Sequence, residues 1–384
     1  MSQPPPLQPG PNGPPSATPS SSAEHEIGAR AVQVNCPNCG ANMVWDPEAD
    51  ALSCGYCRHT LVVPRLEGTI VERTLEEVGT AARGFGVATR AAKCSRCGAK
   101  TDFVGQDVST ACVFCGAPTV LEESSYRNAL RPQSVIPLDV SRTQIEGAFK
   151  TWTKGLWFRP NELKRARVDG ARGLYVPAWS FDANVFSQWS ADAGWYYTVM
   201  EPRPVMVNGK MSVRMVPVQK VRWEPAFGER RDVFDDLLVH ASKGLSPKLA
   251  AELGGFETKG LVPYRPEYLS GWSAEEYAVD LESGWKRGLE RIEEHQTSRC
   301  SGDVPGDTQR NLRVRNTVSH VRWKLVLLPV WSVTYRHGGK DYAVLVHGTS
   351  GRVVGDAPYS WIKIAALVFA VGVGVIVLLG LMSL

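Results

Sequence analysis

CPNCGANMVWDPEADALSCGYC at residues 36–57 and CSRCGAKTDFVGQDVSTACVFC at residues 94–115 decide the fold of the N-terminal third of this 384-residue chain. Each stretch holds two Cys-x-x-Cys pairs with fourteen residues between them, and the second stretch repeats the first at a period of 58 residues. Four thiolates that bind zinc at about 2.3 Å lie about 3.7 Å apart, a spacing that two tight turns joined by a hairpin provide. The pattern therefore predicts two zinc β-ribbons, at residues 31–64 and 93–122, with one structural Zn2+ each. The predicted metal ligands are Cys36, Cys39, Cys54, Cys57, Cys94, Cys97, Cys112 and Cys115.

Other uses of paired cysteines fit this pattern less well. A redox Cys-x-x-Cys pair stands alone at the start of a helix, not in four copies in register, and disulfides are rare in reducing compartments. Iron remains the alternative metal for four thiolates. Because cysteine fills every position of each site, no coordination position is open for catalysis. The ninth cysteine, Cys300, is predicted to be a free thiol.

The two ends of the chain differ sharply in composition. Residues 1–30 are rich in proline and serine, with eight prolines among the first 20 residues, and are predicted to be disordered. Residues 364–384 contain no charged side chain over 21 positions. A helix of that length is about 30 Å long, which matches the hydrocarbon layer of a bilayer. We therefore expect a C-terminal transmembrane helix over residues 361–384.

The residues around this apolar segment predict its orientation. Arg352 and Lys363 precede the segment, and positively charged flanks stay on the cytoplasmic side of a membrane. The expected protein is a single-pass protein of the cell inner membrane with the bulk of the chain in the cytoplasm. Ala366, Ala370 and Gly374 recur every fourth residue and permit close helix contact, so a homo-oligomer is an open possibility.

Residues 65–92 are expected to link the two ribbons, and residues 130–357 are predicted to form an α+β domain with a mainly antiparallel sheet. A strand motif, VPAWSF at residues 176–181, recurs as LPVWSV at residues 328–333. A glycine-bounded turn at residues 348–351 predicts a hairpin after the second copy.

Helix starts in this domain are predicted by three capping signals, which are Ser141-x-x-Gln144, Ser246-Pro247 and Ser273-x-x-Glu276. The last of them predicts a helix that runs to about residue 296. Its apolar stripe is typical of a helix that packs against a core.

Composition and the motif search limit the function. The formal net charge, 43 − 39 = +4, is too small for a polycation that binds nucleic acid by charge alone. The sequence contains no G-x-x-x-x-G-K-[ST], H-E-x-x-H or G-x-S-x-G motif, so we do not expect an enzyme. Residues 150–172 and 308–324 each carry a net charge of +5 and could face anionic lipid head groups, nucleic acid or only solvent.

Several motifs together resemble a known bacterial family. After the cysteine pairs come RPQSVIPLDV, GLYVPAWSFDA, LVPYRPEYLSGW, LLPVWSVTY and HGTSGRVVGDAP. This order, over about residues 31–363, is similar to that of the TFIIB-type zinc-ribbon-containing membrane proteins, some of which are labelled as primosomal helicases. The resemblance implies that the eight cysteines bind metal. It also implies a scaffold role beside SPFH-domain or phage-shock-type membrane-stress proteins. The helicase label transfers poorly, because no ATP-binding motif accompanies it.

The leading hypothesis is a membrane-anchored adaptor or scaffold that faces the cytosol and binds protein partners at the inner membrane surface. The alternative is a zinc-ribbon protein that binds nucleic acid in replication or transcription and accompanies a helicase. An enzyme with dispersed catalytic residues is the third hypothesis.

Overall fold

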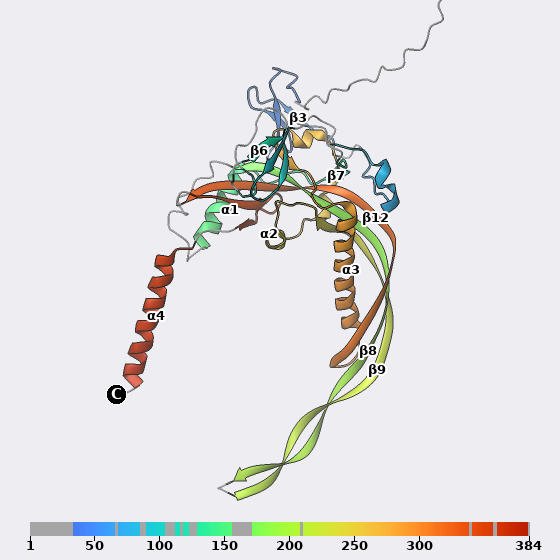
Figure 1. The fold of residues 1–384 in the computed structure, drawn as a ribbon, viewed down its shortest axis with the longest axis vertical. Coiled ribbons are helices and arrows are strands. Elements are labelled where there is room, and N and C mark those ends of the chain that lie inside the picture. Colours follow the sequence, from blue (N-terminus) through green and yellow to red (C-terminus); the bar gives the residue numbers. More distant parts are fainter. Residues whose placement is uncertain are drawn as a thin grey trace, which may run out of the picture.

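The computed structural model describes residues 34–65, 68–84, 90–103, 112–115, 117, 119–122, 129–155, 171–207, 210–337, 340–355 and 359–382. The described chain is mixed α+β, with one large, strongly curved sheet that carries most of the other elements (Figure 1). The predicted disordered tail at 1–30 and most of the basic stretch 150–172 lie outside the described residues.

Two sheets organise the strands. The small sheet, in the order β1-β2-β3, belongs to the first cysteine stretch. The large sheet has the order β10-β7-β12-β8-β11-β5-β4-β6, and β9, β13 and β14 attach to it at its sides. Most neighbours are antiparallel, while β12 with β7 and β11 with β8 are parallel. The strands are β1 (Met43–Asp46), β2 (Ala51–Cys54), β3 (Thr60–Leu61), β4 (Arg90–Cys94), β5 (Lys100–Phe103), β6 (Thr119–Glu122), β7 (Ser134–Val135), β8 (Arg172–Val207), β9 (Lys210–His240), β10 (Val262–Pro263), β11 (Ser273–Glu275), β12 (Thr308–His337), β13 (Lys340–His347) and β14 (Val353–Gly355).

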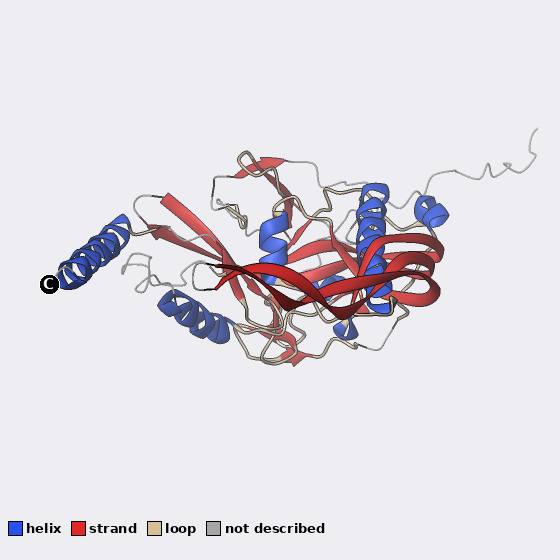
Figure 2. Ribbon diagram, turned by 90° about the horizontal axis from the view of Figure 1, so that it is seen from below, coloured by secondary structure: helices blue, strands red, loops and turns tan. Residues whose placement is uncertain are grey.

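The described helices are α1 (Arg142–Gly155), α2 (Pro247–Leu253), α3 (Leu281–Asp303) and α4 (Trp361–Met382), with short 3-10 turns η1 (Leu75–Thr80), η3 (Thr258–Gly260) and η4 (Pro266–Leu269). Helix α3 packs against β8, β9 and β12 on the inner side of the curve. Figure 2 shows the same arrangement from below, with α4 projecting from the body at the C-terminal end.

The repeated strand motif lies in the two central strands. Val176 of β8 pairs with Leu328 of β12, so the two copies of the motif meet at their first residues and run in opposite directions from that pair. The core beside them is aromatic: the rings of Trp179 and Trp323 lie 5.7 Å apart, edge to face. The Trp179 indole N–H also donates to the carbonyl of Val279 at 2.9 Å. Both strands are therefore buried on the side where the tryptophans point.

Two of the three predicted helix starts are confirmed. The backbone N–H of Ser141 donates to the Gln144 side chain at 2.7 Å, and α1 begins at the next residue. The Ser246 hydroxyl caps α2, which begins at Pro247 and ends before Gly254 at a φ of 87°.

The third predicted helix start is wrong. Ser273 and its neighbours form strand β11, which pairs with β5 and β8, and helix α3 begins only at Leu281. Asp280 is the actual cap, since its carboxylate accepts from the backbone N–H of Ser283. Pairing on both sides of β11 outweighs the local capping signal.

The predicted transmembrane helix is also wrong. Helix α4 (Trp361–Met382) forms at the predicted place. No helix in the described part of the chain is long and apolar enough to cross a membrane. This finding overturns the C-terminal anchor and the single-pass inner-membrane localisation that depended on it.

The most unusual element is a long two-stranded arm, which the sequence analysis did not predict. The pairing of β12 with β8 begins at Gly194, and beyond that point β8 and β9 continue alone to the chain reversal between Val207 and Lys210. We call residues 195–222 the arm. It leaves the body as a twisted ribbon (Figure 1).

Candidate metal centres

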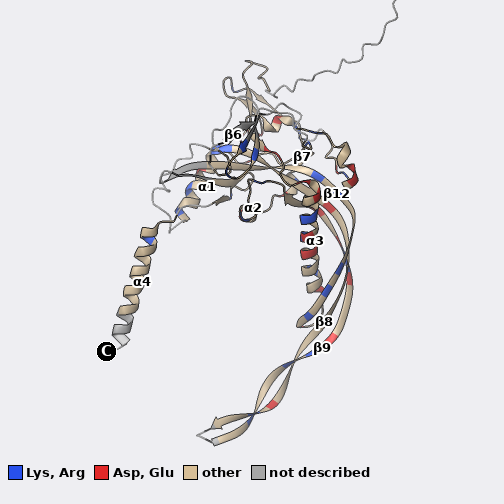
Figure 3. Ribbon diagram, in the orientation of Figure 1, with Lys and Arg blue, Asp and Glu red and all other residues tan. Residues whose placement is uncertain are grey.

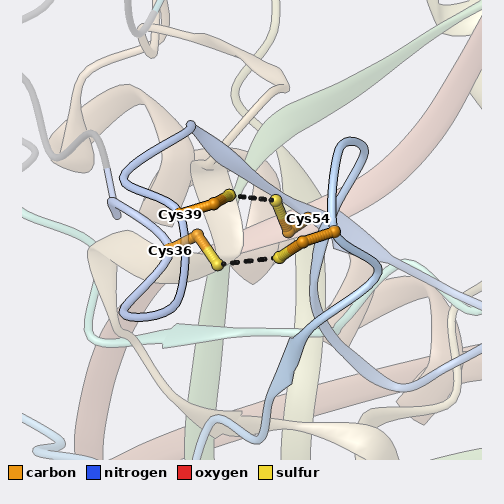
Figure 4. Close-up of side chains that lie close together, drawn as sticks. Cys36, Cys39 and Cys54 are labelled. Carbon is orange, nitrogen blue, oxygen red and sulfur yellow. Dashed lines mark hydrogen bonds between the residues drawn. The ribbon is translucent and has the colours of Figure 1, made fainter.

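The first cysteine cluster brings two turns face to face. The Sγ atoms of Cys36 and Cys57 lie 3.4 Å apart, and those of Cys39 and Cys54 lie 3.5 Å apart (Figure 4). All four sulfurs lie within 4.8 Å of one another. A tetrahedron of thiolates around zinc has edges of about 3.7 Å, so the sulfurs already stand close to the spacing that the metal requires.

The second cluster has the same geometry. Cys94 and Cys115 have Sγ atoms 3.6 Å apart, as do Cys97 and Cys112, and again all four lie within 4.8 Å. Backbone N–H groups also point at the sulfurs, since Phe114 donates to Cys112 Sγ at 3.4 Å. Such bonds stabilise thiolate over thiol. The structure therefore brings all eight predicted ligands together in two sets of four, and each set can hold one structural zinc ion.

Each turn closes with the same backbone hydrogen bond. The first cysteine of each pair donates its N–H to the carbonyl five residues later, at 2.6 to 2.9 Å, and these bonds are Cys36 to Ala41, Cys54 to His59, Cys94 to Ala99 and Cys112 to Ala117. In three turns the residue before that carbonyl has a left-handed backbone, namely Gly40 at a φ of 74°, Arg58 at 60° and Gly98 at 74°. Glycine adopts this conformation freely, whereas Arg58 does so at a cost.

Each cluster contains at least one cysteine whose thiol has a lowered pKa. Donation from the backbone N–H of His59 lowers the pKa of Cys57 to about 6. In the second cluster, donation from the Cys112 thiol lowers the pKa of Cys97 to about 5. Each set therefore contains a thiolate at neutral pH, which is the form that binds metal.

The first cluster is joined to the body mainly by side chains, with one backbone hydrogen bond from the Trp45 N–H to the Ser270 carbonyl at 3.1 Å. Cys36 and Cys54 belong to the same buried cluster as Tyr268 and Leu327 of the body. The indole N–H of Trp45 donates to the carbonyl of Leu138 at 3.1 Å, and the Trp45 ring meets the Tyr268 ring at 4.9 Å. These contacts connect the first metal site to the core of the body.

The second cluster is joined through the backbone. Its strand β5 pairs with β11, and β11 in turn pairs with β8, so the ribbon is part of the large sheet. Cys94 and Cys112 share a buried cluster with Leu174 and Leu328 of the central strands. Loss of this metal would therefore disturb the sheet directly.

A buried carboxylate beside the second ribbon was not predicted. Glu275 of β11 is 1% exposed, and its Oε1 accepts from the backbone N–H groups of Lys243 and Gly244 at 3.1 and 3.0 Å. Its Oε2 has no hydrogen-bond partner among the described residues. Burial raises the pKa of this carboxyl to about 7. No sequence motif marks it, because only the pairing of β11 buries it.

A cavity of about 940 Å3 lies between α2, α3 and the end of β9. Its wall includes His240, Lys243, Arg287, Arg291 and Glu294. Burial lowers the pKa of His240 to about 4, so the imidazole is neutral, and its Nδ1 has no hydrogen-bond partner among the described residues. No sequence motif marks this group of residues, because the wall comes from separate parts of the chain.

The basic stretch 308–324 is partly neutralised. The Nζ of Lys324 is 2.8 Å from Glu72 and 2.6 Å from Asp236, and the side chain is only 5% exposed. The guanidinium of Arg310 lies 3.0 Å from Asp192. Figure 3 shows charges of both signs along the sheet rather than one basic surface.

The remaining predicted residues are placed as follows. Cys300 is a free cysteine buried on α3, apart from both clusters. Ala366, Ala370 and Gly374 are exposed on α4, so their role in self-association stays a prediction.

Comparison with known proteins gives one distant relative. The chain is 28% identical over 359 residues to an uncharacterized protein of Bacillus subtilis (strain 168), YdjG, and the match covers 92% of this chain and 98% of the relative. No family model and no solved structure matches. The family resemblance drawn from the motifs is therefore not confirmed, but the likeness to the Bacillus protein is not confined to the cysteine clusters.

Proposed function

We propose that this protein is an adaptor that binds protein partners and uses two structural zinc ions to hold its interaction domain together. The observation that carries the proposal is that both four-thiolate clusters adjoin the core of the body. Cys36, Cys54, Cys94 and Cys112 are buried, while the other four ligands are exposed or half-buried. Four thiolates leave no open position for a substrate or water. The metal therefore serves folding, and recognition falls to the surface.

A candidate recognition surface lies where the first ribbon meets the body. A cavity of about 460 Å3 opens there, and its lining includes Trp272 and Trp331, the acids Asp46 and Glu48, and Arg142. The rings of Trp272 and Trp331 meet edge to face, with centroids 4.9 Å apart. The Trp272 indole N–H has no hydrogen-bond partner among the described residues. Aromatic and acidic walls suit a lysine or arginine side chain of a partner protein. SPFH-domain and phage-shock-type proteins, which the resemblance implies, are the first partners to test.

The experiment measures metal and partners together. Metal analysis of the purified full-length protein should give two zinc ions per chain, C36S and C94S should each lose one, and the matched control C300S should keep both. Quantitative capture with wild-type protein and C300S should recover the same partners, and E48K should lose them. Fewer than one zinc in the wild type would overturn the metal assignment. Equal recovery by E48K would overturn the recognition surface.

Nucleic-acid binding is less well supported. Two of the five cations of the stretch 308–324 are already paired with acids, and phosphate binding depends on free cations. Salt-sensitive binding of the full-length protein to DNA or RNA at physiological salt would favour this alternative over the adaptor.

Small-molecule binding is the second candidate, because of the cavity with His240. The His240 imidazole is neutral, its Nδ1 has no hydrogen-bond partner among the described residues, and Lys243, Arg287 and Arg291 line the same cavity. This combination suits an anionic ligand such as a carboxylate or phosphate. A rise in melting temperature with inorganic phosphate that H240A abolishes would support it, and no shift at millimolar phosphate would contradict it.

A further inference from the structure

The arm has two faces of different chemistry. Directly paired residues of an antiparallel ladder lie on the same face, and successive pairs alternate between the faces. On one face none of the twelve residues is charged. These pairs are Tyr196 with Val221, Thr198 with Gln219, Met200 with Pro217, Pro202 with Met215, Pro204 with Val213 and Met206 with Met211. We call this the uncharged face.

The other face carries every charge of the arm residues whose side chains are described. These are Glu201, Arg203, Arg214, Lys220 and Arg222, a net charge of 4 − 1 = +3. Contacts within the face agree with the register, since Lys220 lies 2.6 Å from Glu201 and Arg222 lies over the Trp195 ring at 5.8 Å. We call this the charged face.

The uncharged face is open to solvent in a single chain. Met206 is 68% exposed, Met211 75%, Val213 69%, Met200 56% and Met215 55%. A two-stranded ribbon on its own is only marginally stable in water, and a continuous apolar patch marks a site of contact. We therefore expect a binding partner to bury this face.

The partner must contact this face rather than pair with the outer edge of β8 or β9. Proline has no N–H to donate, so within a ladder its nitrogen must point away from the paired strand. Pro202 and Pro204 therefore leave the outer edge of β8 without two N–H donors, and Pro217 leaves the outer edge of β9 without one. Both edges are thereby blunted against an added strand.

We propose that the uncharged face packs against the same face of a second copy of this chain. The partition of charge is the first reason, because two arms joined in this way keep their cations on the outside, where they do not repel. A lipid surface would instead require the cations beside the inserted apolar side chains. Methionine side chains, four on this face, adapt readily to one another.

The size of the face is the second reason. Eleven residues at about 3.4 Å each and two strands about 4.8 Å apart give roughly 400 Å2 in plan per copy. With the relief of the side chains, two copies bury on the order of 1,000 Å2, where specific interfaces begin. The contact is isologous, so a two-fold axis closes it as a dimer. This inference does not depend on the zinc sites or on the adaptor role.

Matched double variants of the full-length protein test the proposal. M206E/M211E places two charges on the uncharged face, and the control V205E/S212E places the same two charges on the neighbouring pair of the charged face. By sedimentation velocity, the wild type and the control should be dimers, and M206E/M211E should raise the dimer Kd about 100-fold or more. A wild type that stays monomeric at about 100 µM, or equal weakening in both variants, would overturn it.

Two adjacent tyrosines give a second readout that does not depend on affinity. Tyr196 and Tyr197 are both 47% exposed but lie on opposite faces. A photoreactive benzoyl-phenylalanine at Tyr196 should yield covalent dimers on irradiation, and the same group at Tyr197 should not. Equal cross-linking from both positions would indicate association through another surface, such as α4, and would contradict the proposal. The proposal would also be contradicted if M206E/M211E no longer bound anionic vesicles but kept the oligomeric state of the wild type.

Discussion

The two ribbons come from one repeated sequence unit, yet they are attached to the body in different ways. The first forms its own three-stranded sheet and docks mainly through side chains, with one backbone hydrogen bond from the Trp45 N–H to the Ser270 carbonyl at 3.1 Å. Val44 packs so closely on Gly271 that a β-carbon there would lie 2.3 Å from it. The second docks in the same manner through Phe114 on Gly244, but it also shares the large sheet through β5 and β11. The repeated sequence thus provides the same four ligands in both ribbons. The pairing of β5 with β11 connects only the second ribbon to the large sheet, so we expect its metal site to be coupled more strongly to the rest of the fold.

Removing one ligand from each cluster should break the symmetry of the repeat. C94S should cost on the order of 5 kcal/mol of unfolding free energy and C36S on the order of 3, because the backbone ladder transmits the loss of the second metal to β8. Chemical denaturation followed by tryptophan fluorescence measures both, and C300S serves as the control.

Hydrogen exchange separates local from global effects of these variants. C36S should raise exchange mainly at residues 34–65, whereas C94S should raise it at 90–122 and along β8 and β11. Equal spread of exchange in both variants would show that the side-chain contacts of Trp45 couple the first ribbon as strongly as the shared sheet couples the second.

The buried carboxylate of Glu275 lies beside the second ribbon, on β11, and should make the stability of the fold depend on pH. Burial raises the pKa of Glu275 from 4.5 to about 7, so the folded protein keeps a proton that the unfolded chain releases. Stability conferred by the neutral form is therefore lost as pH rises from about 4.5 to about 7. E275Q is neutral throughout and keeps an acceptor oxygen for Lys243 and Gly244.

Denaturation at pH 5.5 and pH 8 measures this effect. The unfolding free energy of E275Q relative to wild type should increase by about 1–2 kcal/mol between the two pH values. Protonation of the cysteines affects both proteins alike and cancels in the difference. A difference that stays constant with pH would show that Glu275 remains ionised in the fold.

The sequence predicted what depends on short-range chemistry. The eight cysteines and the caps at Ser141 and Ser246 act within a few residues, so spacing alone located them. The helix expected from Ser273 failed because strand pairing on two sides outweighs a capping signal.

Features that depend on distant partners were missed. The arm was missed although its sequence carries a hairpin signal, Asn208-Gly209 between the two strands. What the sequence does not show is that β12 pairs with β8 only as far as Gly194, which leaves the rest of the hairpin without a third strand. The membrane anchor was predicted from composition alone, and the described helix does not meet the requirement. Glu275 and the cavity of His240 arise only from tertiary contacts.

The smallest expected effect concerns the one described turn in which the repeat departs from glycine. Arg58 has a φ of 60° where Gly40 and Gly98 both have 74°, and an L-residue in this region costs about 1–2 kcal/mol. R58G should therefore stabilise the protein by about 1 kcal/mol, since the greater freedom of glycine in the unfolded chain offsets part of the gain. Thermal and chemical denaturation of the zinc-loaded protein measure it, with R58A, which removes the side chain but keeps an L-residue in the left-handed conformation, as control. A loss of stability in R58G would mean that the Arg58 side chain contributes more than its backbone strain costs, and the two ribbons would then differ in their turns as well as in their attachment.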